Sequence, residues 1–181
     1  RPTRHDVKAV EYFIKEKLRR TSLRDITEFV HFALTSEDVN NISYALMLRD
    51  CLNAELIPAL DEILRVLDAL AVKYAAAPLL ARTHGQPAVP TTFGKEFRVF
   101  HARLSRQVRQ LKAARIAAKL NGASGNYNAH AAAFPRANWR KFSREFIESF
   151  NSGGGPALEY NPFTTQIEPH DSYAELFYNL R

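Results

Sequence analysis

Residues 35–70 read TSEDVNNISYALMLRDCLNAELIPALDEILRVLDAL, and this stretch decides the fold. Aliphatic residues recur at helical spacing along nearly all of it, at Ile42, Leu46, Leu52, Leu56, Leu60, Ile63, Leu67 and Leu70. Such a period predicts a helix with one apolar face. The opening Thr35-Ser36-Glu37-Asp38 supplies a capping hydroxyl and early acids, which the N-terminus of a helix favours. We predict a helix of roughly forty residues, kinked at Pro58.

The segment before this helix is also predicted to be helical. Residues 6–20 carry apolar side chains at helical spacing, and Ser22 is placed to cap a second helix that includes Ala33. The composition agrees, because strong helix formers dominate long stretches and only 7 glycines occur. The sequence therefore predicts an all-α fold.

The segment after the long helix predicts its partner. Pro78 and the run Gly85-Gln86-Pro87 interrupt the pattern, and Thr91 or Thr92 then begins another long helix that reaches about Leu120. Two long helices joined by a compact loop imply an antiparallel pair inside a bundle. Beyond them we predict an ordered loop or short extended segment over 121–135, a helix over 138–150, a flexible loop over 151–156 and the first turns of a helix over 171–181.

Charge and cysteine content narrow the functional class. The net charge is +6, and residues 103–119 hold six bases and no acid. These bases are spaced like a helix face that is solvated or that meets acids on a neighbouring helix. No aromatic residues alternate with them, so nucleic-acid binding is disfavoured. The single Cys51 excludes an internal disulfide framework, and its place between Leu48 and Leu52 predicts a buried, inert thiol. No apolar run reaches membrane-span length, so we expect a cytosolic protein and no membrane partner.

Two polar clusters lie at predicted helix starts. In the first, Arg4-His5-Asp6, a His-Asp pair could orient an imidazole or hold an anion, or Asp6 could simply cap the helix. In the second, Thr35 and Ser36 set two hydroxyls over free backbone amides, which suits a carboxylate and equally suits a helix cap.

Two further clusters lie in predicted loops. Thr83-His84-Gly85 holds a histidine that packing explains poorly, although a structural role stays open. Gln166, in the polar run 164–171, could donate to a carboxylate or belong to an ordinary loop. The other three histidines outside these clusters, His31, His101 and His130, are predicted to be structural or exposed. No ligand set has metal spacing and no glycine-rich phosphate loop occurs, so we expect no metal and no cofactor.

Five segments together resemble a known superfamily. They are HDVKAVEYFIKEKL, EFVHFALTSEDVNNISYALML, PLLARTHGQPAVPTTFGKEF, NGASGNYNAHAAAFP and NPFTTQIEPHDSYAELF, in family order from His5 to Phe177. The string RTHGQPAxPTTxGKE is typical of the fumarase/aspartase superfamily. The strings TSEDxNN, GNYNAH and TTQIEPHD resemble the adenylosuccinate lyase family within it.

The resemblance implies a C–N lyase of purine biosynthesis that needs no cofactor. Members of that family release fumarate from adenylosuccinate, leaving AMP, and also from the succinyl-carboxamide ribotide intermediate. The resemblance implies that His84 is the general acid and that Thr83 contacts substrate. It implies that Thr35 and Ser36 bind the succinyl carboxylate, that Gln166 contacts the succinyl group, and that His5 and Asp6 lie near the nucleotide. Arg4 is carried over as a weaker substrate contact.

The resemblance also sets expectations about the whole protein. The family's mobile loop with the serine base and its N-terminal phosphate-binding Arg-Tyr have no match in these residues, and family active sites draw on three subunits of a homotetramer. We therefore expect the chain by itself to be inactive. Residues 1–34 would close an N-terminal helical domain, and 35–181 would begin a central bundle of long helices.

Two alternatives differ from this interpretation. Another lyase of the superfamily, such as an argininosuccinate lyase, is disfavoured by TTQIEPHD and would be distinguished by a panel of substrates. A non-catalytic helical interaction module is disfavoured by the presence of His84, Thr35 and Ser36. A tight helical partner without nucleotide affinity would favour it.

Overall fold

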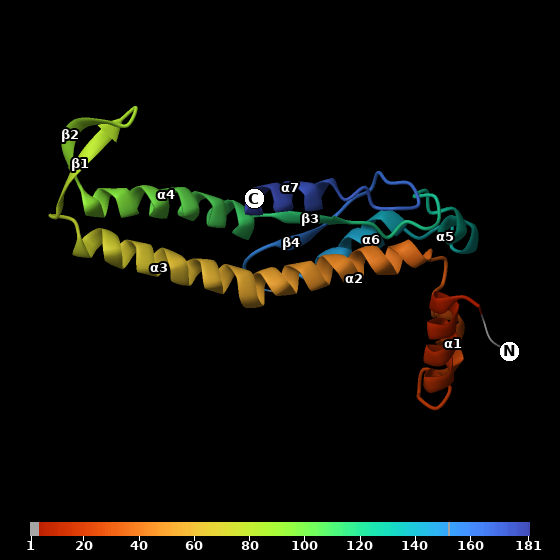
Figure 1. Ribbon diagram of the computed structural model, residues 1–181. Helices are drawn as coiled ribbons and strands as arrows, with labels where there is room; N and C mark the ends of the chain where they lie inside the picture. Colours follow the sequence, from red (N-terminus) through yellow and green to blue (C-terminus); the bar gives the residue numbers. More distant parts are fainter. Residues whose placement is uncertain (1–3, 152) are drawn as a thin grey trace. The chain divides into compact units, whose positions relative to one another are not determined.

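The computed structural model describes residues 4–151 and 153–181 (Figure 1). Their elements, in chain order, are α1 (Asp6–Leu18), the 3-10 helix η1 (Arg24–Phe29), α2 (Ser36–Cys51), the π-helical turn η2 (Leu52–Leu56), α3 (Ile57–Lys73), β1 (Pro78–Thr83), β2 (Gln86–Thr92), α4 (Phe93–Lys112), β3 (Arg115–Ala118), α5 (Asn128–Ala133), α6 (Trp139–Glu148), β4 (Ala157–Tyr160) and α7 (Asp171–Leu180). The described chain is mostly helical. The stricter prediction of an all-α fold is wrong, because two short two-stranded sheets are present.

The chain divides into two compact units. The first contains the described residues up to Leu46, together with Ala117–Asn151 and Leu158–His170. The second contains Met47–Ile116, Asp171–Arg181 and the described part of Ser152–Ala157. The predicted domain boundary between residues 34 and 35 stays a prediction.

The predicted long helix is present as α2, η2 and α3, which follow one another from Ser36 to Lys73. The irregularity expected at Pro58 is a widened turn just before it. There the Ile57 N–H donates to the Leu52 carbonyl, five residues back. Pro58 has no N–H to donate to Ala54, and the wide turn lies where that regular bond is missing.

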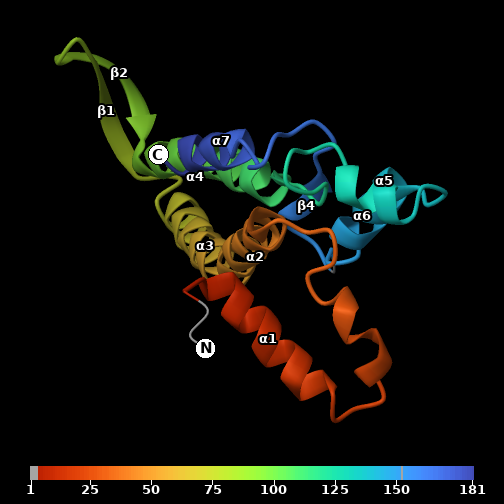
Figure 2. The ribbon, with the colours of Figure 1, turned by 90° about the vertical axis from the view of Figure 1, so that its right-hand side faces the viewer.

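The second unit is built on the antiparallel pair α3 and α4 (Figure 1). Gly94 permits their close approach, since an added Cβ would lie 2.3 Å from the Ala71 carbonyl oxygen. Helix α7 lies beside α4 in both views (Figures 1 and 2), and the Asn179 side chain donates to Gln107 and Gln110 at 2.9 and 3.0 Å. The predicted antiparallel pair is confirmed.

The connection between α3 and α4 is a β-hairpin rather than a compact loop. Strand β1 pairs with β2 in antiparallel register from Pro78↔Thr92 to Thr83↔Gln86. Prolines that cannot continue a helix are tolerated in this isolated two-stranded ribbon, where both strands are edges. Of the two threonines expected to begin this helix, Thr92 caps α4, because its hydroxyl accepts the Lys95 N–H at 3.2 Å.

Helix α4 ends at Lys112, about eight residues before the predicted end. The alanine-rich segment that follows forms β3, in which the buried positions Ile116 and Ala118 alternate. The Ala157 N–H donates to Ala114 and the Asn161 N–H to Ala118, an equal offset that marks β3 and β4 as a parallel pair. Tertiary pairing thus overrides the helix preference of alanine.

Three smaller predictions are wrong. The segment expected to be a helix capped by Ser22 forms only η1, because His31 and Ala33 adopt left-handed conformations with φ of 61° and 56° that end any helix. The ordered loop predicted over 121–135 contains the short helix α5. Cys51 is exposed, since the buried stripe of this helix passes through Leu52 beside it.

Candidate active site

His84 lies at the tip of the β1–β2 hairpin, in the second unit. His84 and Gly85 are the two central turn residues, and both have positive φ, 51° and 74°. This is the signature of the type I′ turn that suits a two-residue hairpin, and it requires residues that tolerate the left-handed region. The side chains of Thr83 and His84 are exposed. The turn therefore presents an imidazole on a short, defined backbone.

The N-terminus of α2 lies in the first unit and carries the predicted carboxylate-binding pair. The Thr35 N–H donates to an Asp38 carboxylate oxygen at 2.9 Å, so Asp38 caps this end of the helix. Among the described residues, neither the Thr35 nor the Ser36 hydroxyl takes part in a hydrogen bond, and both residues are half-buried. The prediction that these hydroxyls could cap the helix is thus replaced by capping from Asp38, and both stay available to a ligand.

Below this helix start lies a buried ion pair. The Lys119 Nζ is 2.9 Å from Asp38 Oδ1, and both side chains are 0% exposed. The Asp38 carboxylate also accepts the N–H groups of Asn121 and Gly122, at 3.1 Å each for the shorter bond. A buried charge requires such compensation. The expectation of a helix face, solvated or meeting acids on a neighbouring helix, is wrong for Lys119. Arg103, Arg106 and Arg109 are exposed, and Lys112 meets Asp61 of the neighbouring α3 at 2.8 Å.

All three protons of the Lys119 ammonium have an acceptor. Besides Asp38, the Nζ donates to the Gly122 carbonyl at 3.0 Å and to the Gln166 carbonyl at 2.8 Å. Asn41 fixes the same lysine through its backbone, accepting the Lys119 N–H at 2.8 Å and donating to its carbonyl at 3.1 Å. We call these four residues, Asp38, Asn41, Lys119 and Gly122, the buried clamp.

The clamp holds the loop that carries Gln166. In addition to the Lys119 bond, the Asn121 amide donates to the Thr164 hydroxyl at 2.8 Å. Gly125 approaches so closely that an added Cβ would lie 2.1 Å from the Thr164 carbonyl oxygen. The Gln166 side chain itself is exposed. Two predicted contacts of the succinyl group, the start of α2 and the Gln166 loop, are therefore joined through one network.

Arg4, His5 and Asp6 lie at the start of α1, in the first unit but outside the clamp. The His5 Nδ1 accepts the Lys8 N–H at 3.2 Å, so His5 is the N-cap, and Asp6 accepts the adjacent Val7 N–H at 2.8 Å. The structural alternative of helix capping is therefore realised, chiefly by His5 rather than Asp6. All three residues are exposed, and their role with substrate stays a prediction.

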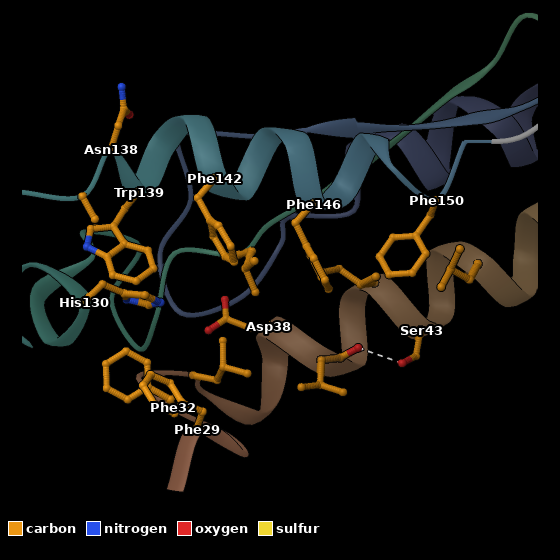
Figure 3. Close-up of a pocket in the computed structure, with 16 residues that line it drawn as sticks. Phe29, Phe32, Asp38, Ser43, His130, Asn138, Trp139, Phe142, Phe146 and Phe150 are labelled. Carbon is orange, nitrogen blue, oxygen red and sulfur yellow. Dashed lines mark hydrogen bonds between the residues drawn. The ribbon is translucent and has the colours of Figure 1, made fainter. Parts of the chain in front are cut away.

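A separate cavity of about 650 Å³ lies in the first unit, between α2 and α6. Figure 3 shows Trp139, Phe142 and Phe146 projecting from α6 toward α2, with Phe150 just after the end of α6 and Asp38 between the helices. Its lining is mainly apolar and includes neither Thr35, Ser36 nor Gln166. His130 borders it, and burial lowers the pKa of this imidazole while Asp38 opposes the shift. His130 is thus buried, which agrees with the structural role that was one of its two predicted alternatives.

Sequence reasoning placed Thr35, Ser36 and Gln166 but missed what connects them. Asp38 and Asn41 stand within the TSEDxNN string, where Asp38 was assigned only to the helix start and Asn41 was given no role. The signal for Lys119 is its neighbourhood, because a lone lysine inside the apolar run from Ile116 to Leu120 requires a buried partner. In the described parts of the chain, no helix is long and apolar enough to cross a membrane, and no cluster of three or more His, Cys, Asp or Glu side chains could hold a metal.

A family model described as lyase matches residues 1–181, and the chain belongs to this lyase family. It is 51% identical over 178 residues to the adenylosuccinate lyase of Escherichia coli K12, covering 98% of this chain and 38% of that protein. It is 50% identical to the adenylosuccinate lyase of Haemophilus influenzae over the same shares. The chain thus spans about two fifths of the length of the curated relatives it matches.

Solved structures agree on the fold. The 3-carboxy-cis,cis-muconate lactonizing enzyme of Pseudomonas putida matches with a TM-score of 0.57 at 29% identity, over 70% of this chain and 28% of that one. The fumarate lyase of Mesorhizobium sp. BNC1 matches with a TM-score of 0.61 at 21% identity, over 85% of this chain and 34% of that one. The fumarate-lyase type of fold expected from the sequence is therefore present.

Proposed function

We propose that a complete protein containing this chain releases fumarate from adenylosuccinate, leaving AMP, and from the succinyl-carboxamide ribotide intermediate of purine biosynthesis. The observation that carries the proposal is the start of α2, where two hydroxyls stand unused above a helix N-terminus. Such an end favours a carboxylate. The 51% identity to an adenylosuccinate lyase, over 98% of the chain, supports the particular substrate.

The proposed reaction is an elimination without a cofactor. A base takes a proton from the succinyl carbon next to a carboxylate. The electron pair left behind forms the double bond of fumarate while the C–N bond breaks, and the departing nitrogen takes a proton from His84. An imidazole can carry that proton near neutral pH, and the exposed hairpin tip leaves it accessible.

The remaining residues bind and orient the substrate in this proposal. Thr35 and Ser36 hold the succinyl carboxylate on which negative charge builds, so their contribution is largest in the transition state. Gln166 and Thr83 contact the succinyl group and the reacting region. Arg4, His5 and Asp6 lie toward the nucleotide, to which their exposed position at the start of α1 makes them accessible.

The proposal extends to the assembly and location. We place the complete protein in the cytoplasm as a homotetramer of long-helix bundles, with each active site shared between subunits, and we place a domain boundary near residues 34–35. The exposed apolar residues of α3, such as Ile63 and Val66, support burial against further helices. On this view the 181-residue chain alone is inactive.

The test compares fumarate release from adenylosuccinate by the complete protein and by this chain. We expect release by the complete protein alone, at a rate followed by ultraviolet absorbance. Argininosuccinate serves as the control substrate, because a related lyase would prefer it. A folded, tetrameric complete protein that releases no fumarate from adenylosuccinate would refute the proposal.

A further inference from the structure

The buried clamp connects two segments that are far apart in the sequence. The start of α2 and the Gln166 loop are both bonded to residues 119–122, and the Lys119 ammonium is the shared group. Its three acceptors are the Asp38 carboxylate, the Gly122 carbonyl and the Gln166 carbonyl, at 2.8–3.0 Å. The bond to Gln166 is to its backbone carbonyl, so Lys119 fixes the backbone position from which the Gln166 side chain projects.

The clamp also determines the charge at the helix start. Asp38 places a carboxylate in the first turn of α2, directly below Thr35, where it would repel an anionic ligand. The Lys119 ammonium neutralises it at 2.9 Å inside a site that water does not reach. The positive end of the helix dipole is therefore left for an external anion.

From this geometry we infer that Lys119 and Asp38 are positioning residues for the carboxylate end of the substrate. They touch no substrate themselves. Lys119 holds the Gln166 backbone and cancels the charge of Asp38, while Asp38 fixes the backbone of Thr35 and of Gly122. The inference rests on the proposed function, because it states that the clamp orients the residues that bind the succinyl half of adenylosuccinate and not those that bind the nucleotide half.

The two products separate this role from a general loosening of the fold. Fumarate carries the carboxylates, and AMP carries the base, ribose and phosphate. We expect Lys119→Met in the complete protein to raise the inhibition constant of fumarate about tenfold or more. Loss of one charge-assisted hydrogen bond weakens binding by about that factor. The inhibition constant of AMP should stay within about twofold.

The controls keep the test decisive. Lys141→Met removes a lysine of the same unit that is 68% exposed and forms a long 3.7 Å pair with Glu145, and both inhibition constants should stay at wild-type values. Where Lys119→Met does not fold, the double variant Asp38→Asn with Lys119→Met removes both charges together and avoids an unpaired buried carboxylate. It should still weaken fumarate selectively, because the bond to the Gln166 carbonyl is lost.

The outcomes are separable. A selective rise for fumarate in a folded variant supports the inference. Unchanged constants, or equal rises for fumarate and AMP, overturn it while leaving the lyase proposal intact. Wild-type protein that releases no fumarate from adenylosuccinate overturns the proposed function, and the inference falls with it.

Discussion

The two regions that carry the predicted site residues are held in opposite ways. Around the start of α2, a buried lysine and aspartate join three chain segments, and both side chains are 0% exposed. At the hairpin tip, His84 is exposed and its position depends on the two-residue turn and the β1–β2 ladder, with one exposed 3.4 Å bond from the Arg82 guanidinium to the Gly85 carbonyl. The first region therefore couples binding to folding, whereas the second can be altered with little cost to the fold.

The largest expected effect concerns stability at the buried clamp. Lys119→Met leaves the Asp38 carboxylate buried and unpaired, and should lower the free energy of unfolding by about 3–5 kcal/mol. Lys112→Met removes a 2.8 Å pair with Asp61 whose members are each 42% exposed, and should cost about 0–1 kcal/mol. Urea unfolding of both variants measures the difference. Equal losses would show that the buried pair contributes no more to stability than the exposed pair between α3 and α4.

The next effect concerns chemistry at the hairpin tip. His84→Asn should lower fumarate release by the complete protein about a hundredfold or more, as loss of a general acid does. Asparagine tolerates positive φ, so the turn should persist and the unfolding midpoint should stay at the wild-type value. Steady-state turnover and thermal unfolding test the two halves. Wild-type turnover would remove His84 from the proposed role.

Two glycines sharpen the contrast further. Gly125→Ala forces a Cβ to within 2.1 Å of the Thr164 carbonyl, whereas Gly153→Ala, at a similar φ of +81°, meets nothing within 4 Å. Alanine at a positive φ carries a similar conformational cost at both positions. The difference between their free energies of unfolding therefore isolates the clash, which we expect to cost about 1–3 kcal/mol. Chemical unfolding measures it. Equal destabilisation would mean that the Gln166 loop yields freely at this contact.

The smallest effect is a pH dependence from His130. Burial lowers the pKa of this imidazole in the folded state, so between that pKa and the unfolded value of about 6.5 the unfolded chain binds more protons. Stability is therefore complete above about pH 6.5 and declines as the pH falls through that window. His130→Phe, which keeps an aromatic ring beside Trp139, should reduce the decline. An unchanged pH profile of the unfolding free energy would contradict this.

Most helices follow from local sequence patterns, and the exceptions have identifiable causes. The long run from Ser36 to Lys73, the start of α4 at one of the two expected threonines and the helix α6 match the predictions, because each depends on apolar period and on nearby capping groups. The hairpin at 78–92 and strand β3 were missed. The hairpin strands pair with each other across their two-residue turn, and the prolines at the ends of the helical pattern were interpreted as a loop. Strand β3 depends on pairing with β4 much later in the chain, which a local pattern does not contain.

The candidate site likewise has a part that the sequence predicts and a part that depends on the tertiary structure. From the sequence by itself came the fumarate-lyase type of fold, through the resemblance of its motifs, and the candidates His84, Thr35, Ser36 and Gln166. Local chemistry marked these four as candidates and the same resemblance implied their roles. Only the tertiary structure decided that Lys119 leaves the expected solvated face for the interior and joins Asp38 to the Gln166 loop. The physical reason is that a lysine ammonium is buried only where a carboxylate and acceptors for its remaining protons surround it. For Lys119 these acceptors come from residues 38, 122 and 166, which only the folded chain brings together.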